Sequence, residues 1–369
     1  MKEHKYEAIA RNLEDQIRRG EYKPGERIPT ELALVQTYAV SRQTVRQAIG
    51  LLERRGLLVQ RQGSGTYVER DYSRILPRDS RTSTIAVAPC FVSNYIFPSI
   101  MHGIEEVLSS AGYTIRLCPS QHRVDRERAV LQCLLEDSVD GLLVEGVKTC
   151  MPNPNIPLYR ELQRRGVPIV FFNTIYPELD DMVLVSMDDF SVVRDGVKLL
   201  VESGHRRIAG IFRWDDRQGA DRYAGFNAGL LDASIALNDD FVSWYGTVNL
   251  DESNPEHLPP IIDRRWLSSV MEKVTAFVCY NDTVATSLLQ VLERDYSRET
   301  ASRYAVVSFD SSAYYEMSSW KYVSYPHRKV EFGRNAAIKL LNMIGGTAQK
   351  SEKMQWGKPE RTPGAPFMP

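Results

Sequence analysis

The feature that most constrains the fold is an alternation, from Thr84 onward, of short apolar runs with longer amphipathic segments. Short apolar runs are typical of buried strands, and apolar residues three or four apart indicate helices. Because strict alternation of strand and helix favours a parallel sheet covered on both faces, and more than 250 residues follow the pattern, we expect an α/β fold with two doubly wound parallel sheets. The expected strands are Thr84–Ala88, Tyr113–Leu117, Gly141–Val144, Val167–Phe172, Ile208–Phe212, Ala276–Cys279 and Ala305–Phe309. The expected helices between them include Pro98–Ala111, Asp125–Glu136, Asp189–Ser203, Tyr223–Ser234 and Asp282–Asp295.

The chain of 369 residues fits two domains and divides near residue 75. Residues 1–70 form the expected first domain, and residues 71–83 are a polar, charged linker interrupted by Pro77. Residues 84–348 form the second domain. The tail, 349–369, is rich in Pro, Gly and basic residues, and we expect it to lie irregularly on the surface.

Several classes of protein are excluded. The N-terminal run MKEHKYEAIARNLEDQ is charged and has no apolar stretch typical of a secretory signal. No apolar run approaches the roughly 18 residues that cross a bilayer, so we expect no membrane partner. The five cysteines are scattered and form no C-x-x-C pair, which indicates buried, free thiols and a cytoplasmic location.

The first domain has the pattern of a helix-turn-helix followed by a β wing. Thr30 and Ser41 each precede an apolar-periodic segment, as hydroxyl N-caps do. Glycines separate two short apolar runs at its end, which favours a hairpin. The expected helices are Lys5–Arg19, a short second helix after Thr30, and Arg42–Arg55; the expected strands are Leu57–Gln60 and Thr66–Glu69, around Arg61–Gly65.

Exposed side chains at the start of the third helix indicate a double-stranded DNA partner. Arg42 and Arg46 lie four residues apart, on the end that enters the major groove in such motifs. Gln43 and Thr44 supply hydrogen bonds for base discrimination. Residues 1–80 hold 15 basic against 11 acidic residues, whereas the whole chain has a net charge of −1. A basic, solvated face on a protein-binding winged helix is the alternative.

The runs GEYKPGERIPTELAL and VSRQTVRQAIGLLERRGLLVQRQGSGTYV resemble the winged-helix domain of the GntR family of bacterial regulators. Leu32 departs from this pattern, because many members carry an arginine there. The resemblance implies DNA contacts through Ser41, Arg42, Gln43, Thr44, Arg46, Gln62 and Gly63.

In the second domain, polar side chains follow the carboxyl ends of the expected strands, where ligands bind in open α/β sheets. Carboxylates, amides and an arginine, with aromatic rings nearby, suit a polyhydroxylated ligand such as a sugar. Each has a structural alternative: helix caps for Asp282 and Asp310, a surface ion pair for Arg222, and core packing for Tyr95 and Phe97. The pair Asp188-Asp189 suggests a helix start or a metal ligand, and His205 a turn residue.

Residues 84 to about 345 resemble the effector domain of the LacI/GalR regulators, which is similar to periplasmic sugar-binding proteins. This chain has His327-Arg328 where that family usually carries Gln-Pro. Runs such as SNYIFPSIMHGIE and DDRQGADRYAGF resemble members of this combined architecture that respond to L-arabinose. The resemblance implies a homodimer and the ligand contacts Tyr95, Phe97, Glu145, Lys148, Asn173, Asp215, Gln218, Arg222, Asn281 and Asp310.

Together these patterns predict a transcriptional regulator, a repressor released from operator DNA by L-arabinose or a related pentose. We expect no enzymatic activity, no cofactor and no metal, because the sequence has no Ser/His/Asp order, metal-ligand spacing or phosphate loop. The alternatives are a sugar-binding protein for transport and a sugar-acting enzyme, each with an accessory winged helix.

Overall fold

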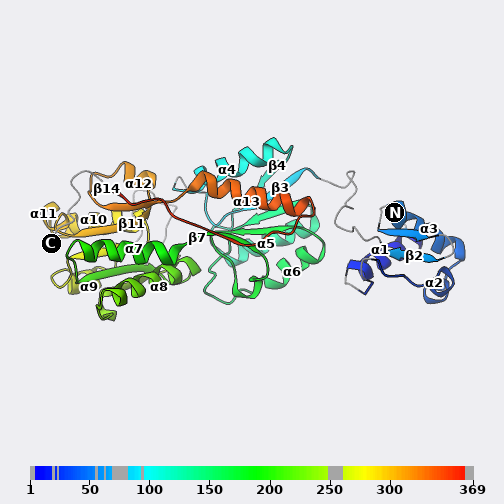
Figure 1. Ribbon diagram of the computed structural model, residues 1–369, viewed down its shortest axis with the longest axis horizontal. Helices are drawn as coiled ribbons and strands as arrows, with labels where there is room; N and C mark the ends of the chain where they lie inside the picture. The colour runs from blue at the N-terminus through cyan, green and yellow to red at the C-terminus, as the bar shows by residue number, and fades with distance from the viewer. Residues whose placement is uncertain are drawn as a thin grey trace.

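The computed structural model describes residues 5–18, 21–22, 25–54, 57–61, 64–68, 82–92, 95–247 and 261–361. They form a winged-helix domain and a sensor domain of two α/β lobes (Figure 1). Among these residues no helix is both long and apolar enough to cross a membrane.

The winged-helix domain has three helices and a two-stranded antiparallel wing. One apolar cluster joins these elements, with Leu13, Val45 and Leu52 fully buried at its centre. Thr30 accepts a hydrogen bond from the backbone N–H of Ala33, as expected of an N-cap. The expected order of elements is confirmed: α1 (Lys5–Arg18), α2 (Glu31–Tyr38), α3 (Arg42–Arg54), β1 (Leu58–Arg61) and β2 (Gly65–Val68).

The first lobe is built on a six-stranded parallel sheet in the order β13-β7-β6-β5-β3-β4. Helices α4 and α13 pack on one face, and α5 and α6 on the other. The strands are β3 (Thr84–Ala88), β4 (Thr114–Leu117), β5 (Gly141–Val144), β6 (Ile169–Phe172), β7 (Val183–Met187) and β13 (Glu352–Met354), and the helices are α4 (Phe97–Ser110), α5 (Val124–Glu136), α6 (Ile156–Arg164) and α13 (Lys329–Ile344).

The second lobe repeats this plan with the order β14-β12-β11-β10-β8-β9, in which only β14 is antiparallel to its neighbour. Helices α7 and α8 cover one face, and α9 and α10 the other. The strands are β8 (Ile208–Arg213), β9 (Val242–Tyr245), β10 (Ala276–Cys279), β11 (Ala305–Asp310), β12 (Val323–Pro326) and β14 (Glu360–Arg361), and the helices are α7 (Asp189–Glu202), α8 (Arg217–Asp232), α9 (Arg264–Val270), α10 (Asp282–Asp295), α11 (Arg298–Ala301) and α12 (Ala313–Glu316).

Helices α4 and α13 come from distant parts of the chain and pack closely through two glycines. A Cβ atom on Gly103 would lie 2.0 Å from the carbonyl oxygen of Val330, and one on Gly333 would lie 2.1 Å from that of Ile100. Any larger side chain would push the helices apart. This contact fixes α13, the helix that follows the second crossing between the lobes.

The expectation of an irregular tail is wrong for Glu352–Met354 and Glu360–Arg361, which form strands. Here β13 extends the first sheet beside β7, and β14 pairs with β12 of the second. This segment is the third crossing between the lobes, after those that lead into α7 and α13 (Figure 1). It is held by Met354, which is buried, and by Trp356, whose ring lies 6.0 Å from Phe309 and 5.3 Å from His327.

Two other expectations need correction. Helix α8 begins at Arg217, after Asp216 as its N-cap, so Arg222 lies within the helix and does not open it. All five cysteines are free, but Cys133 and Cys150 are exposed and not buried, because neither faces a core cluster.

Candidate functional sites

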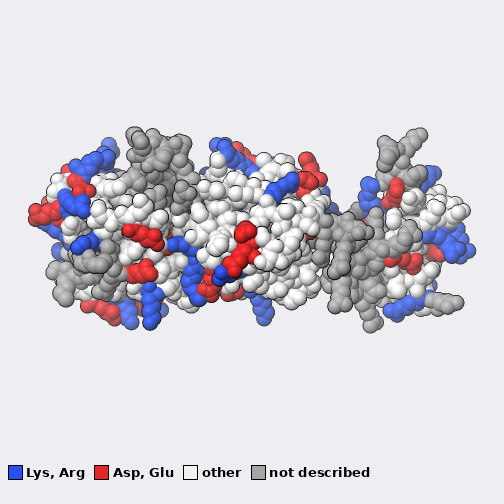
Figure 2. Space-filling model, turned by 90° about the horizontal axis from the view of Figure 1, so that it is seen from above, with Lys and Arg blue, Asp and Glu red and all other residues white. Residues whose placement is uncertain are grey.

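The start of α3 presents the polar face expected of a DNA-reading helix. Ser41 caps the helix by accepting a hydrogen bond of 3.2 Å from the backbone N–H of Thr44, and the two hydroxyls lie 2.8 Å apart. Arg42, Gln43 and Arg46 are exposed beside them. Figure 2 shows basic side chains gathered at the outer end of this domain.

Glu31, at the start of α2, holds both arginines of this face. Its carboxylate accepts from Nε of Arg42 at 2.8 Å, and Nε of Arg46 lies 3.5 Å away. Each guanidinium is anchored through Nε, and both arginine side chains remain about two-thirds exposed. Glu31 was not predicted from the sequence, although its position 11 residues before Arg42 lies within the motif.

The wing lies against Arg27. A Cβ atom on Gly65 would lie 2.5 Å from Nε of Arg27, and the φ angle of Gly65 is 119°, so glycine is required there. The Arg61 guanidinium lies 4.9 Å from the centre of the Tyr67 ring. The expected contacts Gln62 and Gly63 lie outside the described residues.

Arg222 is the centre of a buried ionic network in the second lobe. It is 2% exposed, so the alternative of a surface ion pair is wrong. Its Nε donates to Asp189 at 2.8 Å, Nη1 donates to the carbonyl of Tyr280, and Nη2 lies 3.7 Å from Asp310. Burial alone would lower the pKa of Arg222, but the two carboxylates hold it above its ordinary value. Burial raises the pKa of Asp189 to about 6 despite Arg222.

The same network extends across the lobes. Tyr95, in the loop after β3 of the first lobe, donates a hydrogen bond of 2.5 Å to Asp310 at the end of β11. The backbone N–H of Arg217 donates to the Thr149 hydroxyl at 3.0 Å, a second bond between the lobes. These bonds fix the two lobes against each other at the carboxyl ends of their strands.

A second polar group lies at the end of β5. Glu145 accepts hydrogen bonds of 2.8 Å from the backbone N–H of Cys90 and from the side-chain amide of Asn173. Burial raises the pKa of Glu145. The amide oxygen of Asn173 is buried without a hydrogen-bond partner among the described residues, and its φ angle of 63° is in the left-handed region. An unpartnered buried acceptor favours a hydroxyl donor on a ligand.

Arg213, at the end of β8, was missed as a site residue. Its guanidinium contacts Asp215 at 3.0 Å, Asp216 at 3.3 Å and the Thr247 hydroxyl at 2.9 Å. Asp215 also accepts from the backbone N–H of Thr247 and is completely buried. Asp215 therefore positions Arg213, and Arg213 is better placed than Asp215 to reach a ligand.

The remaining expected residues fall into two groups. Gln218 donates to Asp189 at 3.3 Å and so belongs to the Arg222 network. Asn281 caps α10 through a bond of 3.1 Å from the backbone N–H of Val284. Lys148, in the loop after β5, lies beside His122 and is not part of the Arg222 network. Phe97 is nearly buried at the start of α4.

The structural alternatives are also settled for three residues. Asp282 does not cap a helix; it is fully buried and accepts from Ser308, Ser324 and the backbone of Ser312. Asp188 caps α7, as a helix start requires. His205 bonds the Thr275 hydroxyl at 2.9 Å, a structural role. No cluster of metal-ligating side chains occurs among the residues that the structure describes.

Comparison with known proteins defines the class. Residues 5–68 match the family of bacterial regulatory proteins of the gntR type, and residues 197–363 match the periplasmic binding protein-like domain. Among solved structures, a LacI-type regulator from Alkaliphilus metalliredigens complexed with D-xylulofuranose superposes with a TM-score of 0.63 at 18% identity, over 76% of this chain and 98% of that one. The regulator CelR in complex with cellobiose gives 0.62 at 22% identity, over 88% and 90%. These structures share the fold of the sensor domain.

Two relatives extend over nearly the whole chain. The arabinose metabolism transcriptional repressor of Halalkalibacterium halodurans is 34% identical over 343 residues, 93% of this chain and 90% of the relative. That of Geobacillus stearothermophilus is 35% identical over 345 residues, 92% and 91%. The chain belongs to this family of transcriptional repressors with a GntR-type winged helix and a LacI-like sensor domain. It is a DNA-binding regulator and not an enzyme.

Proposed function

We propose that the protein represses carbohydrate-utilisation genes in the cytoplasm, binding operator DNA as a homodimer until a sugar releases it. L-arabinose or a related pentose is the proposed effector. The names of the two full-length relatives support arabinose, and the gntR match supports operator binding. A two-fold dimer suits half-sites one helical turn apart.

The observation that carries the sugar assignment is the buried network around Arg222. Its planar guanidinium is fixed by Asp189 and lies 4.5 Å from the ring centre of Tyr280 and 5.2 Å from that of Trp356. A charged fork beside aromatic faces can donate to adjacent sugar hydroxyls while the rings cover the apolar C–H face. The other proposed contacts are Tyr95, Phe97, Glu145, Lys148, Asn173, Asp215, Gln218, Asn281 and Asp310, with Asp215 acting through Arg213.

The proposed DNA contacts are Ser41, Arg42, Gln43, Thr44, Arg46, Gln62 and Gly63, with the arginines positioned by Glu31. Strand β5 offers a connection between the two sites. Glu145 follows its carboxyl end, and Asp140 precedes its amino end and accepts from the backbone of Thr82 and Ser83 at the end of the proposed linker, 71–83. A sugar that stabilises the contacts between the lobes would therefore act on the point where the linker is attached. Such couplings amount to about 1–3 kcal/mol.

Calorimetric titration of the full-length protein with a panel of monosaccharides tests the sugar assignment. We expect L-arabinose or another pentose to bind, and the Arg222→Lys variant to bind it at least about tenfold more weakly, because a single ammonium cannot replace the planar fork. The variant Arg164→Lys, at a surface arginine paired with Glu161, is the matched control. Absence of binding by every pentose would contradict the proposal.

A further inference from the structure

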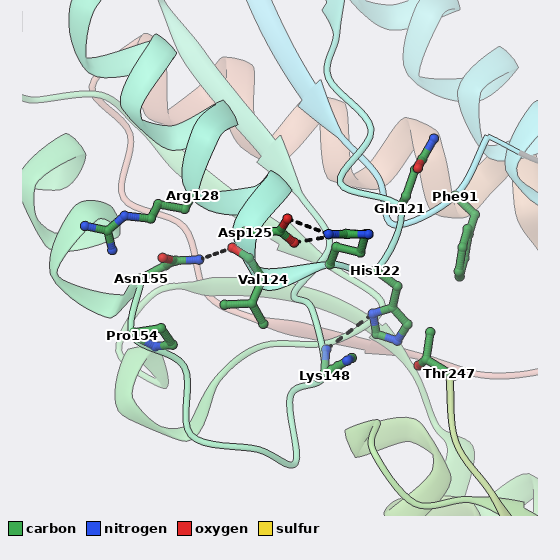
Figure 3. Close-up of a pocket in the computed structure, with 11 residues that line it drawn as sticks. Phe91, Gln121, His122, Val124, Asp125, Arg128, Lys148, Pro154, Asn155 and Thr247 are labelled. Carbon is green, nitrogen blue, oxygen red and sulfur yellow. Dashed lines mark hydrogen bonds and ion pairs between the residues drawn. The ribbon is translucent and has the colours of Figure 1, made fainter. Parts of the chain in front are cut away.

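A pocket of about 780 Å³ lies next to the proposed sugar site and is lined by both lobes. Phe91, His122 and Lys148 contribute to it from loops that follow three strands of the first lobe, and Thr247 contributes from the second lobe (Figure 3). The Thr247 hydroxyl accepts from Arg213, so the pocket adjoins the arginine proposed to reach the sugar. A pocket of this size accommodates a ligand larger than a monosaccharide.

His122 supplies this pocket with a fixed hydrogen-bond donor. The backbone N–H of Lys148 donates to its Nδ1 at 3.3 Å, so Nδ1 carries no proton in that bond (Figure 3). Burial, followed by the charges of Arg213 and Lys148, lowers the pKa of His122 well below its ordinary value, so the ring is neutral. Its single proton is then on Nε2. That atom is buried and has no hydrogen-bond partner among the described residues, while the residue is 2% exposed.

The backbone around this donor is held in an uncommon conformation. Gln121, His122 and Lys148 have φ angles of 51°, 55° and 49°, in the left-handed region that side chains disfavour. Such strain persists where the surrounding structure enforces it, and it is concentrated at ligand sites. Here it places the His122 ring between Lys148 and Thr247 (Figure 3).

The charge of the lining is positive. Lys148 makes no ion pair with any residue that the structure describes, and Arg128 is also unpaired within that part of the chain. The one acidic side chain of the lining, Asp125, accepts hydrogen bonds from Nε and Nη2 of Arg123, at 3.0 and 2.6 Å. A neutral N–H donor beside an ammonium is suited to an anionic acceptor.

We propose that this pocket binds the phosphate group of a phosphorylated sugar, with Nε2 of His122 and Nζ of Lys148 as donors. The assignment rests on the proposed function, since the sugar ring itself would occupy the adjoining site near Arg213 and Arg222. The protein would then distinguish a phosphorylated sugar from the free one, and both classes of effector would bind between the same two lobes.

Calorimetry with L-arabinose, its 1-phosphate, its 5-phosphate and inorganic phosphate tests this assignment. For the wild-type protein we expect one of the two sugar phosphates to bind at least about tenfold more tightly than L-arabinose, a difference that one charge-assisted hydrogen bond can supply. This ratio should fall as sodium chloride is raised, because salt screens the interaction of charges.

Two variants test the phosphate contacts. Because Lys148 is also a proposed sugar contact, the quantity compared is the ratio of sugar-phosphate affinity to L-arabinose affinity, measured on the same variant. Asparagine at 122 can accept from the Lys148 N–H and tolerates a positive φ, but has no donor at the Nε2 position. We expect His122→Asn and Lys148→Met to reduce the affinity ratio to about twofold or less. Lys198→Met, at an exposed lysine on α7, should retain the wild-type ratio. Thermal unfolding of each variant checks that it is folded.

Several results would overturn the assignment. If the wild-type protein bound both sugar phosphates no more tightly than L-arabinose, the phosphate assignment would be wrong. The proposed function would be unaffected by that result. A ratio that survives in both variants would also contradict the phosphate assignment. Inorganic phosphate binding as tightly as the sugar phosphates would indicate a phosphate site unconnected with sugar. If no sugar bound at all, the proposed function itself would fail.

Discussion

Replacing Arg222 by alanine should destabilise the sensor domain as well as abolish sugar binding. The substitution removes the bond to Asp189 at 2.8 Å and the charge 3.7 Å from Asp310, and leaves both carboxylates buried. Breaking a buried ion pair by removing one partner costs about 3–5 kcal/mol, because an uncompensated charge remains. We therefore expect the free energy of unfolding of the sensor domain to fall by about that amount.

Urea unfolding followed by tryptophan fluorescence measures this loss in the full-length protein. All five tryptophans lie in the sensor domain, so the signal is independent of the winged helix. The matched control is Arg194→Ala, which breaks an exposed pair with Asp232 and should cost about 0–1 kcal/mol. The double variant Asp189→Asn with Arg222→Met should be more stable than Arg222→Met alone, because the unpaired buried charge of Asp189 is then removed.

The result that would refute this reasoning is specific. If Arg222→Ala lost less than about 1 kcal/mol, indistinguishable from the surface control, the network would not be an ionic core of the site. If the variant also bound sugar with wild-type affinity, Arg222 would have no role in recognition. Sugar affinity is measured below the unfolding transition, so the two effects remain separate.

Three further predictions concern the DNA surface, the buried carboxylates and the linker. Arg46→Ala should weaken operator binding by about 1–3 kcal/mol if the arginine contacts a base, or reduce the salt slope by about one if it contacts phosphate; unchanged binding in a salt titration would exclude α3 as the reading helix. Burial raises the pKa of Asp282 to about 7, above its value in the unfolded chain, so the free energy of unfolding of the wild type should increase relative to that of Asp282→Asn as pH falls from about 7 to 4. Parallel pH profiles of unfolding for the two proteins would contradict this. Asp140→Ala should bind sugar normally but lose part of the sugar-dependent change in operator affinity, whereas the control Asp137→Ala, at an exposed site, should keep it. If the sugar-dependent change in operator affinity were equal in the two variants, the linker attachment would carry no signal.

Much of the architecture could be predicted from the sequence because its strands are short, continuous apolar runs. Strands β3, β5 and β10 have the expected bounds. Strands β7, β9, β12, β13 and β14 were missed. The last two have only three and two residues, too few to show periodicity, and their pairing depends on partners far away in the chain. The start of α8 was placed six residues late, because its first turn is polar and follows a cap at Asp216.

The candidate site was only partly accessible from sequence. Polar residues after strands could be found one by one, but not the contacts between them. Asp189 suggests only a helix start or a metal ligand until the fold brings it to Arg222, 33 residues later. Similarly, nothing in the sequence indicates that Asp215 forms an ion pair with Arg213, or that the ring of His122 accepts a hydrogen bond from the backbone of Lys148. Such pairings depend on tertiary structure.

The most direct test of the account is the affinity of the full-length protein for operator DNA with and without L-arabinose. A labelled operator, selected by the protein from a random DNA pool, is titrated with protein and followed by fluorescence anisotropy at constant salt. We expect saturating L-arabinose to weaken operator binding about 5- to 150-fold, the range that a typical coupling free energy gives. An operator affinity that is unchanged or increased by L-arabinose and by every related pentose would contradict it.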